Sequence, residues 1–426
     1  MKTRMLIDAS VVTSVSDGLS IYVINLLKHL PEEAFAEFDF SILVTPGLDR
    51  PEFFAAISGR PFRLIEEKIA PIGPRRDWDM FRFLRRRGRE FDLVHVTSNQ
   101  YPFALKGGIC TIHDVTFKRW FHNPGGIPGA RFAAVSYLSA VVANCLRRAS
   151  RIIADSESTR QEVITLFRAS PRQIEKIDVV HLGWEHLLVE PGDETGPLPY
   201  PARSFLLFLG TFRPHKNLAG LLEGFKRVIA DLPADKKLVV SGSSPVSPEL
   251  KATVDSINRD GERIVFTGYL SSADVRRHYA QADAFVFPSL AEGFGLPVLE
   301  AFHYGVPLLC SDRTSLPEIA GEAALYFDPA DPGSIGRAIL RFYREPGLRE
   351  ELVARGRERL REFSWRQTAE RTLAIYRQEA ALRRGAHRAR GGRLSEGSAG
   401  PGAVPDERRS FGSVDNFTRR NRRIWR

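Results

Sequence analysis

The chain of 426 residues is too long for one ordinary domain, and its hydrophobic and charged fractions, 43% and 26%, are those of a water-soluble globular protein. No apolar run approaches the roughly 18 residues of a membrane span, and the amino terminus lacks the apolar stretch of a signal peptide, so we expect a cytoplasmic protein. Three cysteines in apolar surroundings argue against a disulfide framework and against a zinc site.

The net charge of +10 is concentrated at the carboxyl end of the chain. Residues 383–426 hold 12 arginines against four acidic residues, so their net charge is +8 and that of residues 1–382 is only +2. This segment is rich in glycine and poor in apolar residues, which predicts a disordered tail. A solvated terminus explains it without nucleic acid as a partner; contact with anionic lipid or RNA is the alternative.

The amino-terminal half of the chain alternates strands with helices. Strands are expected over residues 5–8, 40–44, 93–96, 108–113, 151–154 and 179–180, and a helix over residues 20–30. Strands that are separated by helical segments predict a parallel, doubly wound sheet.

A second series of strands follows the segment 190–201, which has the proline and glycine density of a linker. These strands are expected over residues 205–209, 237–241, 264–266, 284–287 and 307–310. The sequence therefore predicts an α/β protein with two facing Rossmann-like domains, each with a parallel sheet, and a cleft between them. We place the first domain at 1–185, a linker at 186–203, the second domain at 204–362, a helix packing back on the first domain at 363–382 and the basic disordered tail at 383–426.

The segment 289–302 carries two glutamates, eight positions apart, on either side of a glycine-rich turn. The strand 284–287 precedes it and Pro297 suits the first position of a helix, so we expect Glu292 in a loop and Glu300 in the first helical turn. In open α/β sheets such a loop lies at the carboxyl end of a strand, where ligands bind, and the N–H groups of a helix start attract an anion such as a diphosphate.

Two glycines in this turn admit two explanations. Gly293 and Gly295 leave the backbone bare, as the close approach of a ligand would require. The alternative is ordinary turn chemistry, with Glu300 favoured at a helix start by the macrodipole alone.

Several motifs in the carboxyl half form a set: residues 266–297, 311–318 and 323–329, together with the loop 210–217. They resemble the family 4 retaining glycosyltransferases, which have the GT-B fold of two facing Rossmann-like domains. In this resemblance the loop 210–217 is the phosphate-binding loop, and His113-Asp114 is the histidine motif of the first domain. The resemblance covers roughly residues 5–380.

The resemblance implies a role for each site residue. Glu292 would hold hydroxyls of the donor sugar, Glu300 would bind the ribose, and Lys216 would neutralise the diphosphate. His113 would contact the donor sugar and help to stabilise the transition state. Further donor contacts are implied for Gly210, Arg213, Phe294, Gly295, Leu296 and Gly18.

Two loops depart from the family's pattern. Arg213 and His215 stand where the family often has an acidic residue and an arginine. Arg213 either replaces the missing cation at the donor or is a surface arginine. Near Gly18, Ser20 and Ile21 stand where a second glycine and an arginine are usual. Gly18 either lets the acceptor or the leaving phosphate approach or belongs to an ordinary turn.

The chemistry agrees with the implied roles. Breaking the bond from the anomeric carbon to the phosphate leaves negative charge on the diphosphate and oxocarbenium-like charge on the sugar, so fixed cations and N–H groups lower the barrier. If protein charges do this, no metal is needed, and we expect no cofactor besides the donor. In the family's usual account the leaving phosphate takes the acceptor's proton in a same-face displacement; Glu292 as a nucleophile is a less favoured variant.

The sequence thus predicts a retaining, metal-independent hexosyltransferase. It would move a mannose- or glucose-type sugar from a nucleoside-diphosphate-sugar to a hydroxyl of a glycan or lipid-linked acceptor, in cell-surface polysaccharide or glycolipid synthesis. The alternative is an isomerase of the same fold that resembles nucleotide-sugar 2-epimerases. The donor base, the sugar and the acceptor are left open.

The segment 75–89 contains seven arginines. On a helix, Trp78, Phe81 and Leu84 fall on one face with arginines beside it. We expect this stripe to pack into its own domain, as the apolar face of a surface helix does. A peripheral contact with an anionic membrane, at the inner membrane surface, is the alternative.

Overall fold

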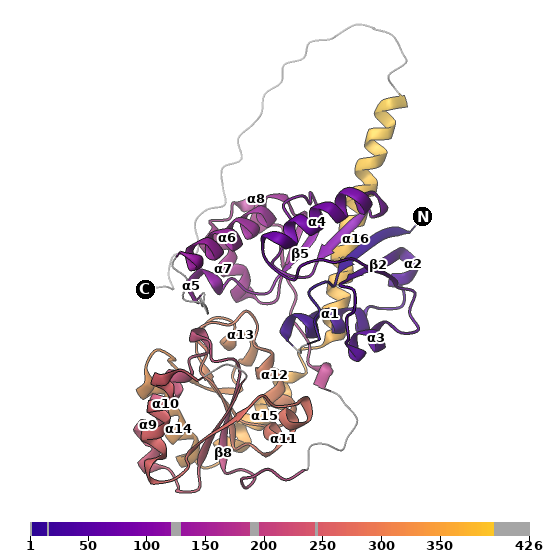
Figure 1. Ribbon diagram of the computed structural model, residues 1–426. Helices are drawn as coiled ribbons and strands as arrows, with labels where there is room; N and C mark the ends of the chain where they lie inside the picture. Colours follow the sequence, from indigo (N-terminus) through magenta and orange to yellow (C-terminus); the bar gives the residue numbers. More distant parts are fainter. Residues whose placement is uncertain (1, 15–16, 121–128, 188–195, 243–245, 396–426) are drawn as a thin grey trace, which may run out of the picture. The chain divides into compact units, whose positions relative to one another are not determined.

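The computed structural model describes residues 2–14, 17–120, 129–187, 196–242 and 246–395. Its strands form two sheets, and helices lie on both faces of each (Figure 1). The chain divides into two compact units, Met1–Ala381 and Leu382–Arg426, and both sheets belong to the first unit. The predicted fold class, two Rossmann-like α/β domains, is confirmed.

The first sheet has seven parallel strands in the order β3-β2-β1-β4-β5-β6-β7. They are β1 (Thr3–Asp8), β2 (Phe38–Val44), β3 (Arg63–Glu66), β4 (Leu93–Val96), β5 (Ile109–Ile112), β6 (Arg151–Ala154) and β7 (Ile177–Val179). The strand order reverses between β1 and β4, which is the point where open parallel sheets bind ligands at their carboxyl edge.

The two faces of the first sheet are covered by different helices, since successive residues of β1 point to opposite sides. Met5 and Ile7 share an apolar cluster with α1 (Gly18–His29), α3 (Pro51–Ile57) and α16 (Trp365–Ser395). Leu6 belongs to a second cluster, with α4 (Pro74–Arg87), α6 (Ala130–Arg148) and α7 (Glu157–Phe167). The short helices are α2 (Ala34–Glu37), α5 (Phe117–Trp120) and α8 (Pro171–Ile174).

The second sheet has six parallel strands in the order β10-β9-β8-β11-β12-β13, so its switch point lies between β8 and β11. The strands are β8 (Phe205–Leu209), β9 (Lys237–Ser241), β10 (Ile264–Gly268), β11 (Ala284–Phe287), β12 (Leu308–Ser311) and β13 (Ala324–Phe327). One face packs against α9 (Leu218–Val228), α10 (Pro248–Ile257), α14 (Pro332–Arg344) and α15 (Leu348–Leu360), and the other against α11 (Ser272–Gln281), α12 (Leu296–His303) and α13 (Leu316–Ala320).

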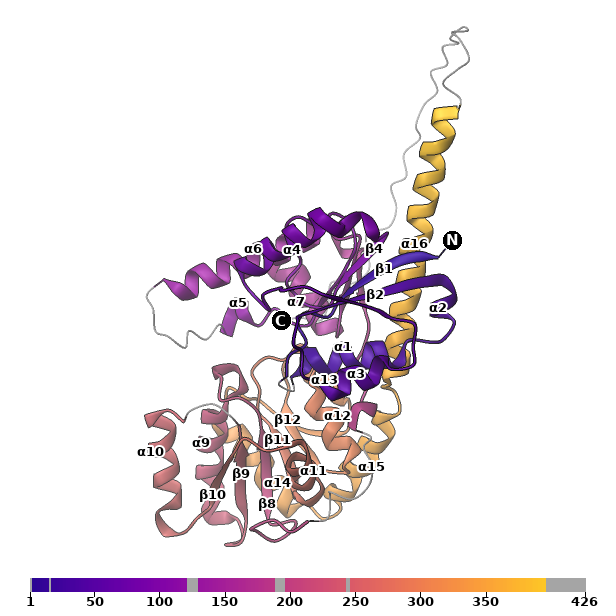
Figure 2. The same ribbon diagram turned by 45° about the vertical axis from the view of Figure 1, so that its right-hand side comes forward.

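Helix α16 joins the core of the first sheet through a buried polar contact. The Tyr376 hydroxyl lies 2.7 Å from Nδ1 of His95, and Nε2 of His95 lies 2.8 Å from the Thr111 hydroxyl (Figure 2 shows α16 beside this sheet). Burial lowers the pKa of His95 to about 3, so its ring is neutral and joins these hydroxyls without a charge.

Two strands and one boundary differ from the sequence-based expectation. The strands β3 and β13 were not expected; each has only four residues and lies at an edge of its sheet. In β3 a single side chain, that of Ile65, is buried. Helix α16 continues to Ser395, past the boundary expected at residue 383, because the arginines and alanines there have high helix propensity. The rest of the predicted tail, residues 396–426, and the linker residues 188–195 lie outside the described residues.

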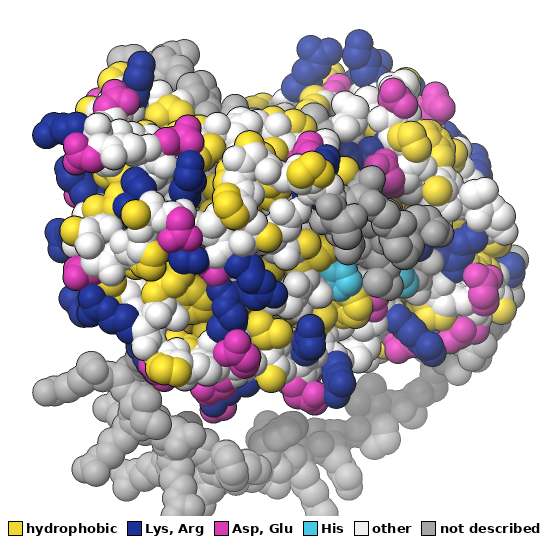
Figure 3. All heavy atoms as spheres, turned by 90° about the horizontal axis from the view of Figure 1, so that it is seen from below, with side chains coloured by type: hydrophobic (Ala, Val, Ile, Leu, Met, Phe, Trp, Pro, Cys, Tyr) yellow, Lys and Arg dark blue, Asp and Glu magenta, His cyan; other side chains and the backbone are white. Residues whose placement is uncertain are grey.

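Charge on the described surface is mixed. On the face seen from below, basic and acidic side chains lie interspersed among apolar ones (Figure 3), as expected from the small net charge of residues 1–382. None of the helices in the described ranges combines the length and the apolar composition that crossing a membrane requires.

Candidate active site

An ion pair between Lys216 and Glu292 lies at the switch point of the second sheet. Lys216 ends a short 3-10 turn after β8, and Glu292 lies in the loop after the neighbouring strand β11. Lys216 Nζ is 2.6 Å from Glu292 Oε1, and the two side chains are only 19% and 13% exposed. The ammonium group also lies 5.4 Å from the centre of the Phe287 ring. The two charges to which the resemblance assigns donor contacts therefore face each other directly.

Glu300 is enclosed near this pair but lies outside the first turn of its helix, contrary to expectation. The helix α12 begins at Leu296, one residue before Pro297, so that Glu300 is its fifth residue. The macrodipole at a first turn therefore does not account for this carboxylate. Its Oε2 accepts a hydrogen bond of 2.9 Å from the buried Tyr279 hydroxyl. Burial raises the pKa of Glu300, although this hydrogen bond and Lys216 act in the opposite direction.

The two glycines beside Glu292 have steric reasons within the protein itself. A Cβ on Gly293 would lie 1.9 Å from the backbone oxygen of His113, which belongs to the first domain. Gly295 has φ +101°, which favours glycine, and a Cβ there would lie 2.8 Å from Leu316 Cδ2. The bare backbone at Gly293 serves the contact between the two domains.

Hydrogen-bond donors remain at the start of α12. Among the described residues, none accepts a hydrogen bond from the N–H groups of Phe294, Gly295 or Leu296. Such groups at a helix start attract anions. The Phe294 ring itself is buried and packs against Phe363 of the segment that leads to α16.

His113 follows β5 at the carboxyl edge of the first sheet, and both of its ring nitrogens have partners. Nδ1 lies 2.6 Å from Asp155 Oδ2 and Nε2 lies 3.0 Å from the Thr97 carbonyl oxygen. Burial alone would lower the pKa of His113, but the charge of Asp155 and its hydrogen bond outweigh burial and raise the pKa. Because a carboxylate and a carbonyl both accept, this geometry suits the doubly protonated ring. The ring can reach a donor sugar only by giving up one of these bonds.

The remaining residues implied by the resemblance are Gly210, Arg213 and Gly18. Gly210 has φ +156° and its N–H donates to the Ser241 carbonyl oxygen at 3.0 Å. Arg213 is exposed, and no described side chain pairs with it. A Cβ on Gly18 would meet nothing within 4 Å, and its φ is not positive, so no steric demand at the start of α1 explains this glycine.

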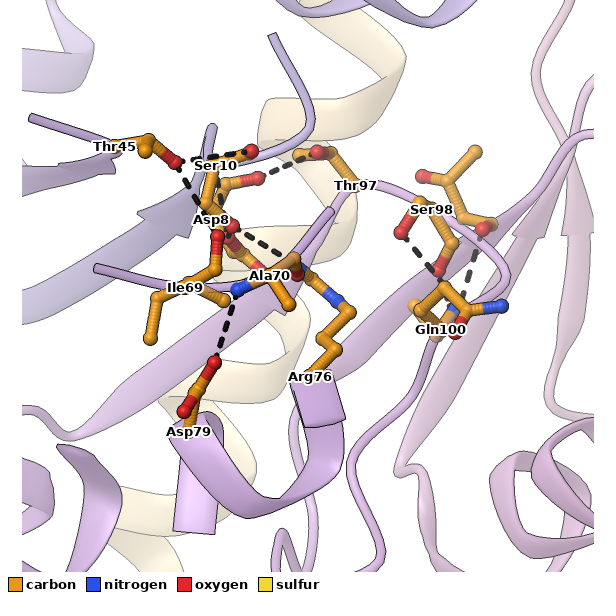
Figure 4. A network of polar contacts seen from close by, with 12 residues as sticks. Asp8, Ser10, Thr45, Ile69, Ala70, Arg76, Asp79, Thr97, Ser98 and Gln100 are labelled. Atoms are coloured by element: carbon orange, nitrogen blue, oxygen red, sulfur yellow. Dashed lines mark hydrogen bonds and ion pairs between the residues drawn. The ribbon is translucent and has the colours of Figure 1, made fainter. Parts of the chain in front are cut away.

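A buried polar network lies at the switch point of the first sheet (Figure 4). Arg76 of α4, 1% exposed, forms an ion pair with Asp8 at the end of β1 and donates to the Ser10 hydroxyl at 2.9 Å. The Thr97 hydroxyl donates to the Asp8 carbonyl oxygen at 2.5 Å, and the Thr97 carbonyl oxygen is the one that contacts His113. The network thus connects α4 to the histidine.

The helix α4 packs with a different face from the one expected. Its buried side chains are Arg76, Met80 and Phe83. Trp78 and Phe81 are 59% and 38% exposed, and their ring centres lie 5.6 Å apart. Of the predicted stripe, Leu84 packs against the core of its own domain, but for Trp78 and Phe81 the expectation was wrong. The ion pair of Arg76 with Asp8 and the buried Met80 and Phe83 turn the opposite face inward.

Several residues of the site were missed by sequence reasoning. Asp155 directly follows the expected strand 151–154, so the rule that placed His113 at a sheet edge would also have found it. Tyr279 lies in α11 and meets Glu300 only through tertiary packing, for which the sequence offers no signal. In the described ranges, no three histidine, cysteine or carboxylate side chains come together as a metal site requires, and the three cysteines are buried and unpaired.

Two doubly wound domains with charged residues at their switch points define a protein of the GT-B class. The model for Glycosyltransferase Family 4 matches residues 16–185, and the model for glycosyl transferases group 1 matches residues 197–359. The chain is 31% identical over 291 residues to O-antigen chain mannosyltransferase B of Escherichia coli, which covers 67% of this chain and 74% of that protein. The chain therefore belongs to this family of glycosyltransferases.

Other proteins are similar to this chain in sequence, and a solved structure has the same fold. MMP alpha-(1->4)-mannosyltransferase of Mycolicibacterium hassiacum is 27% identical over 321 residues, which covers 70% of this chain and 74% of that protein. The match to the serotype-specific mannosyltransferase WbdA of Escherichia coli is 30% identical, covers 52% of this chain and spans only 28% of that protein. The structure of Anabaena Alr3699/HepE with UDP and glucose has the same fold, with a TM-score of 0.64 at 14% identity over 88% of this chain and 100% of that one. Nothing in these comparisons supports the epimerase alternative.

The contact at Gly293 can be tested by one methyl group. We expect Gly293→Ala to lower the rate of sugar transfer about 100-fold, because its Cβ would push the His113 carbonyl away and displace the adjacent Glu292 by about 1 Å. The matched control is Gly88→Ala, whose Cβ would make an ordinary contact of 3.8 Å with Leu84. Steady-state rates of sugar transfer and thermal melts are measured for both variants. If Gly293→Ala transferred sugar at the rate of Gly88→Ala, the steric explanation would be contradicted.

Proposed function

We propose that the protein transfers a mannose- or glucose-type sugar from a nucleoside-diphosphate-sugar to a hydroxyl of a glycan or lipid-linked acceptor, with retention of configuration and without a metal. The observation that carries this proposal is the ion pair of Lys216 and Glu292 beside the N–H groups at the start of α12. An ammonium group and a helix start attract a diphosphate, and a carboxylate binds sugar hydroxyls.

The names of the relatives support the choice of donor and acceptor. O-antigen chain mannosyltransferase B and MMP alpha-(1->4)-mannosyltransferase are mannosyltransferases by name. The HepE structures contain UDP, UDP and glucose, or UDP-glucose. We infer a role in the synthesis of a cell-surface polysaccharide or glycolipid.

In the proposed mechanism Lys216 exchanges partners when the donor binds. The diphosphate, with two negative charges or more, replaces Glu292 at the ammonium group and also accepts from the N–H groups of Gly295 and Leu296. Glu292 is then released to accept hydrogen bonds from the sugar hydroxyls. Glu300, with its Oε2 on Tyr279, keeps its other oxygen for the ribose.

The reaction itself needs few protein groups. The bond from the anomeric carbon to the diphosphate oxygen breaks, the acceptor oxygen bonds to the same face of that carbon, and the acceptor's proton passes to the leaving phosphate. Fixed positive charge at Lys216 stabilises the leaving group in a site withdrawn from water. On the side of the first domain, His113 is fixed by its contacts with Asp155 and with the Thr97 carbonyl oxygen.

Replacing Glu292 tests the assignment of the sugar contact. We expect Glu292→Ala to lower transfer from GDP-mannose or UDP-glucose by about 100- to 1000-fold while the protein stays folded, because the sugar loses its fixed acceptor. The control is Glu350→Ala on the exposed side of α15. Release of nucleoside diphosphate, measured with mannose oligosaccharides as acceptors, is the readout, and near-normal turnover by Glu292→Ala would sink the assignment.

We further propose that the exposed face of α4 contacts an anionic membrane, where a lipid-linked acceptor would be found. Trp78, Phe81, Arg82 and Arg85 occur at helical spacing and are all exposed. Arg82 and Arg85 have no acidic partner among the described residues. Aromatic rings together with unpaired arginines suit the boundary between lipid headgroups and acyl chains.

Vesicle binding tests this surface. We expect Trp78→Ala/Phe81→Ala to bind vesicles of phosphatidylcholine and phosphatidylglycerol at least about tenfold more weakly than the unaltered protein, because two interfacial rings are lost. The control is Phe54→Ala on α3, whose ring is 42% exposed and lies outside this face. The proposal would be refuted if both variants co-sedimented equally with the mixed vesicles. It would also be refuted if the unaltered protein bound vesicles of pure phosphatidylcholine as strongly as the mixed vesicles.

A further inference from the structure

The carboxylate of Glu318 connects the two domains at the start of a helix. Glu318 belongs to α13 of the second domain, and its oxygens accept from the backbone N–H groups of Glu157 and Ser158 at 2.8 and 2.9 Å. These residues open α7 of the first domain. Nε2 of His181, in the segment after β7, lies 2.8 Å from the same carboxylate. The Glu318 side chain of the second domain thus accepts three hydrogen bonds from the first domain.

The electrostatics of this contact favour a charged Glu318. The first N–H groups of a helix carry partial positive charge, and a carboxylate is stabilised there. Burial alone would raise the pKa of Glu318, but the hydrogen bonds from His181 and from the two backbone N–H groups lower it. Arg359 does not compete for the carboxylate, because its guanidinium donates to the backbone oxygens of Glu318 and Ile319 instead.

The same helix start also holds the residue next to Glu292. The hydroxyl of Ser156, the N-cap of α7, donates to the Gly293 carbonyl oxygen at 2.6 Å, and the Thr159 hydroxyl donates to it at 2.9 Å. The first turn of α7 therefore binds the second domain at two places, the carboxylate of Glu318 and the backbone beside Glu292.

Within the second domain, the backbone of Glu292 is hydrogen-bonded to the residues at the start of α13. The N–H of Glu292 donates to the Thr314 hydroxyl at 3.0 Å, and the Ser315 hydroxyl donates to the Glu292 carbonyl oxygen at 3.0 Å. Ser315 is also the N-cap residue of α13, the helix that carries Glu318. The backbone of Glu292 is thus held by the residues at the start of α13, and the carbonyl of the next residue, Gly293, is held by the start of α7. Glu318 joins these two helices.

We propose that Glu318 is the positioning residue that holds the two domains closed over the donor and, through α7, sets the place of Glu292. The inference rests on the proposed function insofar as Glu292 contacts the sugar. These hydrogen bonds join residues of two different domains, and we expect them to break when product leaves and to form again with the next donor.

The first test removes the carboxylate. We expect Glu318→Ala to lower kcat at least tenfold, while the affinity for UDP or GDP changes less than threefold, because Lys216 and the start of α12 lie in the second domain. Small-angle scattering should show less compaction on addition of UDP or GDP than in the unaltered protein. Glu322→Ala is the matched control, since Glu322 is exposed and follows α13 by two residues.

The second test removes one donor from the other domain. Glu157 is the first residue of α7, where proline is tolerated, and Ser156 before it is extended (φ −147°, ψ 158°), as a residue before proline prefers. Glu157→Pro therefore deletes one N–H that binds Glu318 and leaves the helix intact. Glu157→Ala keeps that N–H and is its control. We expect kcat to fall in the proline variant and not in the alanine variant.

The outcomes separate the possibilities. Unchanged kcat and unchanged compaction in Glu318→Ala, or equal kcat in the two Glu157 variants, would overturn the proposal. A loss of UDP and GDP affinity that matches the loss of kcat would also overturn it, since it would mean general damage to the donor site. If no nucleotide-sugar is turned over at all, the proposed function fails, but the scattering measurement with UDP or GDP still tests the closure.

Discussion

The ion pair of Lys216 and Glu292 is the interaction on which the rest of the site depends. Both charges are largely withdrawn from water, so each needs a partner at every stage of a catalytic cycle. In the structure the two charges satisfy each other at 2.6 Å. A diphosphate offers Lys216 a stronger partner, and a sugar offers Glu292 several hydroxyl donors. The pair therefore keeps two charged groups in place at the switch point without leaving either of them alone in a poorly solvated site.

The first domain contributes the shape of the site more than its charge. Gly293 accepts the close approach of the His113 carbonyl because it has no Cβ, and Ser156 and Thr159 bind its carbonyl oxygen. His113 is in turn held by Asp155 and Thr97. The Asp8 carbonyl oxygen accepts from Thr97, and Asp8 pairs with Arg76 of α4 (Figure 4). Through Thr97 and His113, these contacts continue to the backbone beside Glu292.

The fold and the loop position of Glu292 could be predicted from the sequence because they follow short-range rules, whereas Lys216 was singled out by the resemblance to a family. Buried strands of the second domain read as apolar runs, and Lys216 and Glu292 lie in the loops that follow two of them. The rule that ligands bind where parallel strands end then brings these loops together. The edge strand β3 could not be predicted in this way, since it buries few side chains.

The remaining features depend on contacts between distant parts of the chain. In the sequence, Gly293 suggests the close approach of a ligand. Only the structure shows that the backbone oxygen of His113 lies where a Cβ would be. The stripe of Trp78 and Phe81 looks like a packing face, and only the pairing of Arg76 with Asp8 turns it outward. A helical pattern gives the spacing of residues along the helix, but the buried face is chosen by the partner across the sheet.

The exchange of partners at Lys216 is tested most directly by the affinity for a nucleoside diphosphate that carries no sugar. Isothermal titration of UDP and GDP against Glu292→Ala and the unaltered protein isolates the diphosphate contact. The exchange requires Glu292→Ala to bind at least as tightly as the unaltered protein, since the diphosphate no longer competes with a carboxylate for Lys216. Binding that is several-fold weaker would show that Glu292 itself supports the diphosphate, and would contradict the division of roles between the two residues.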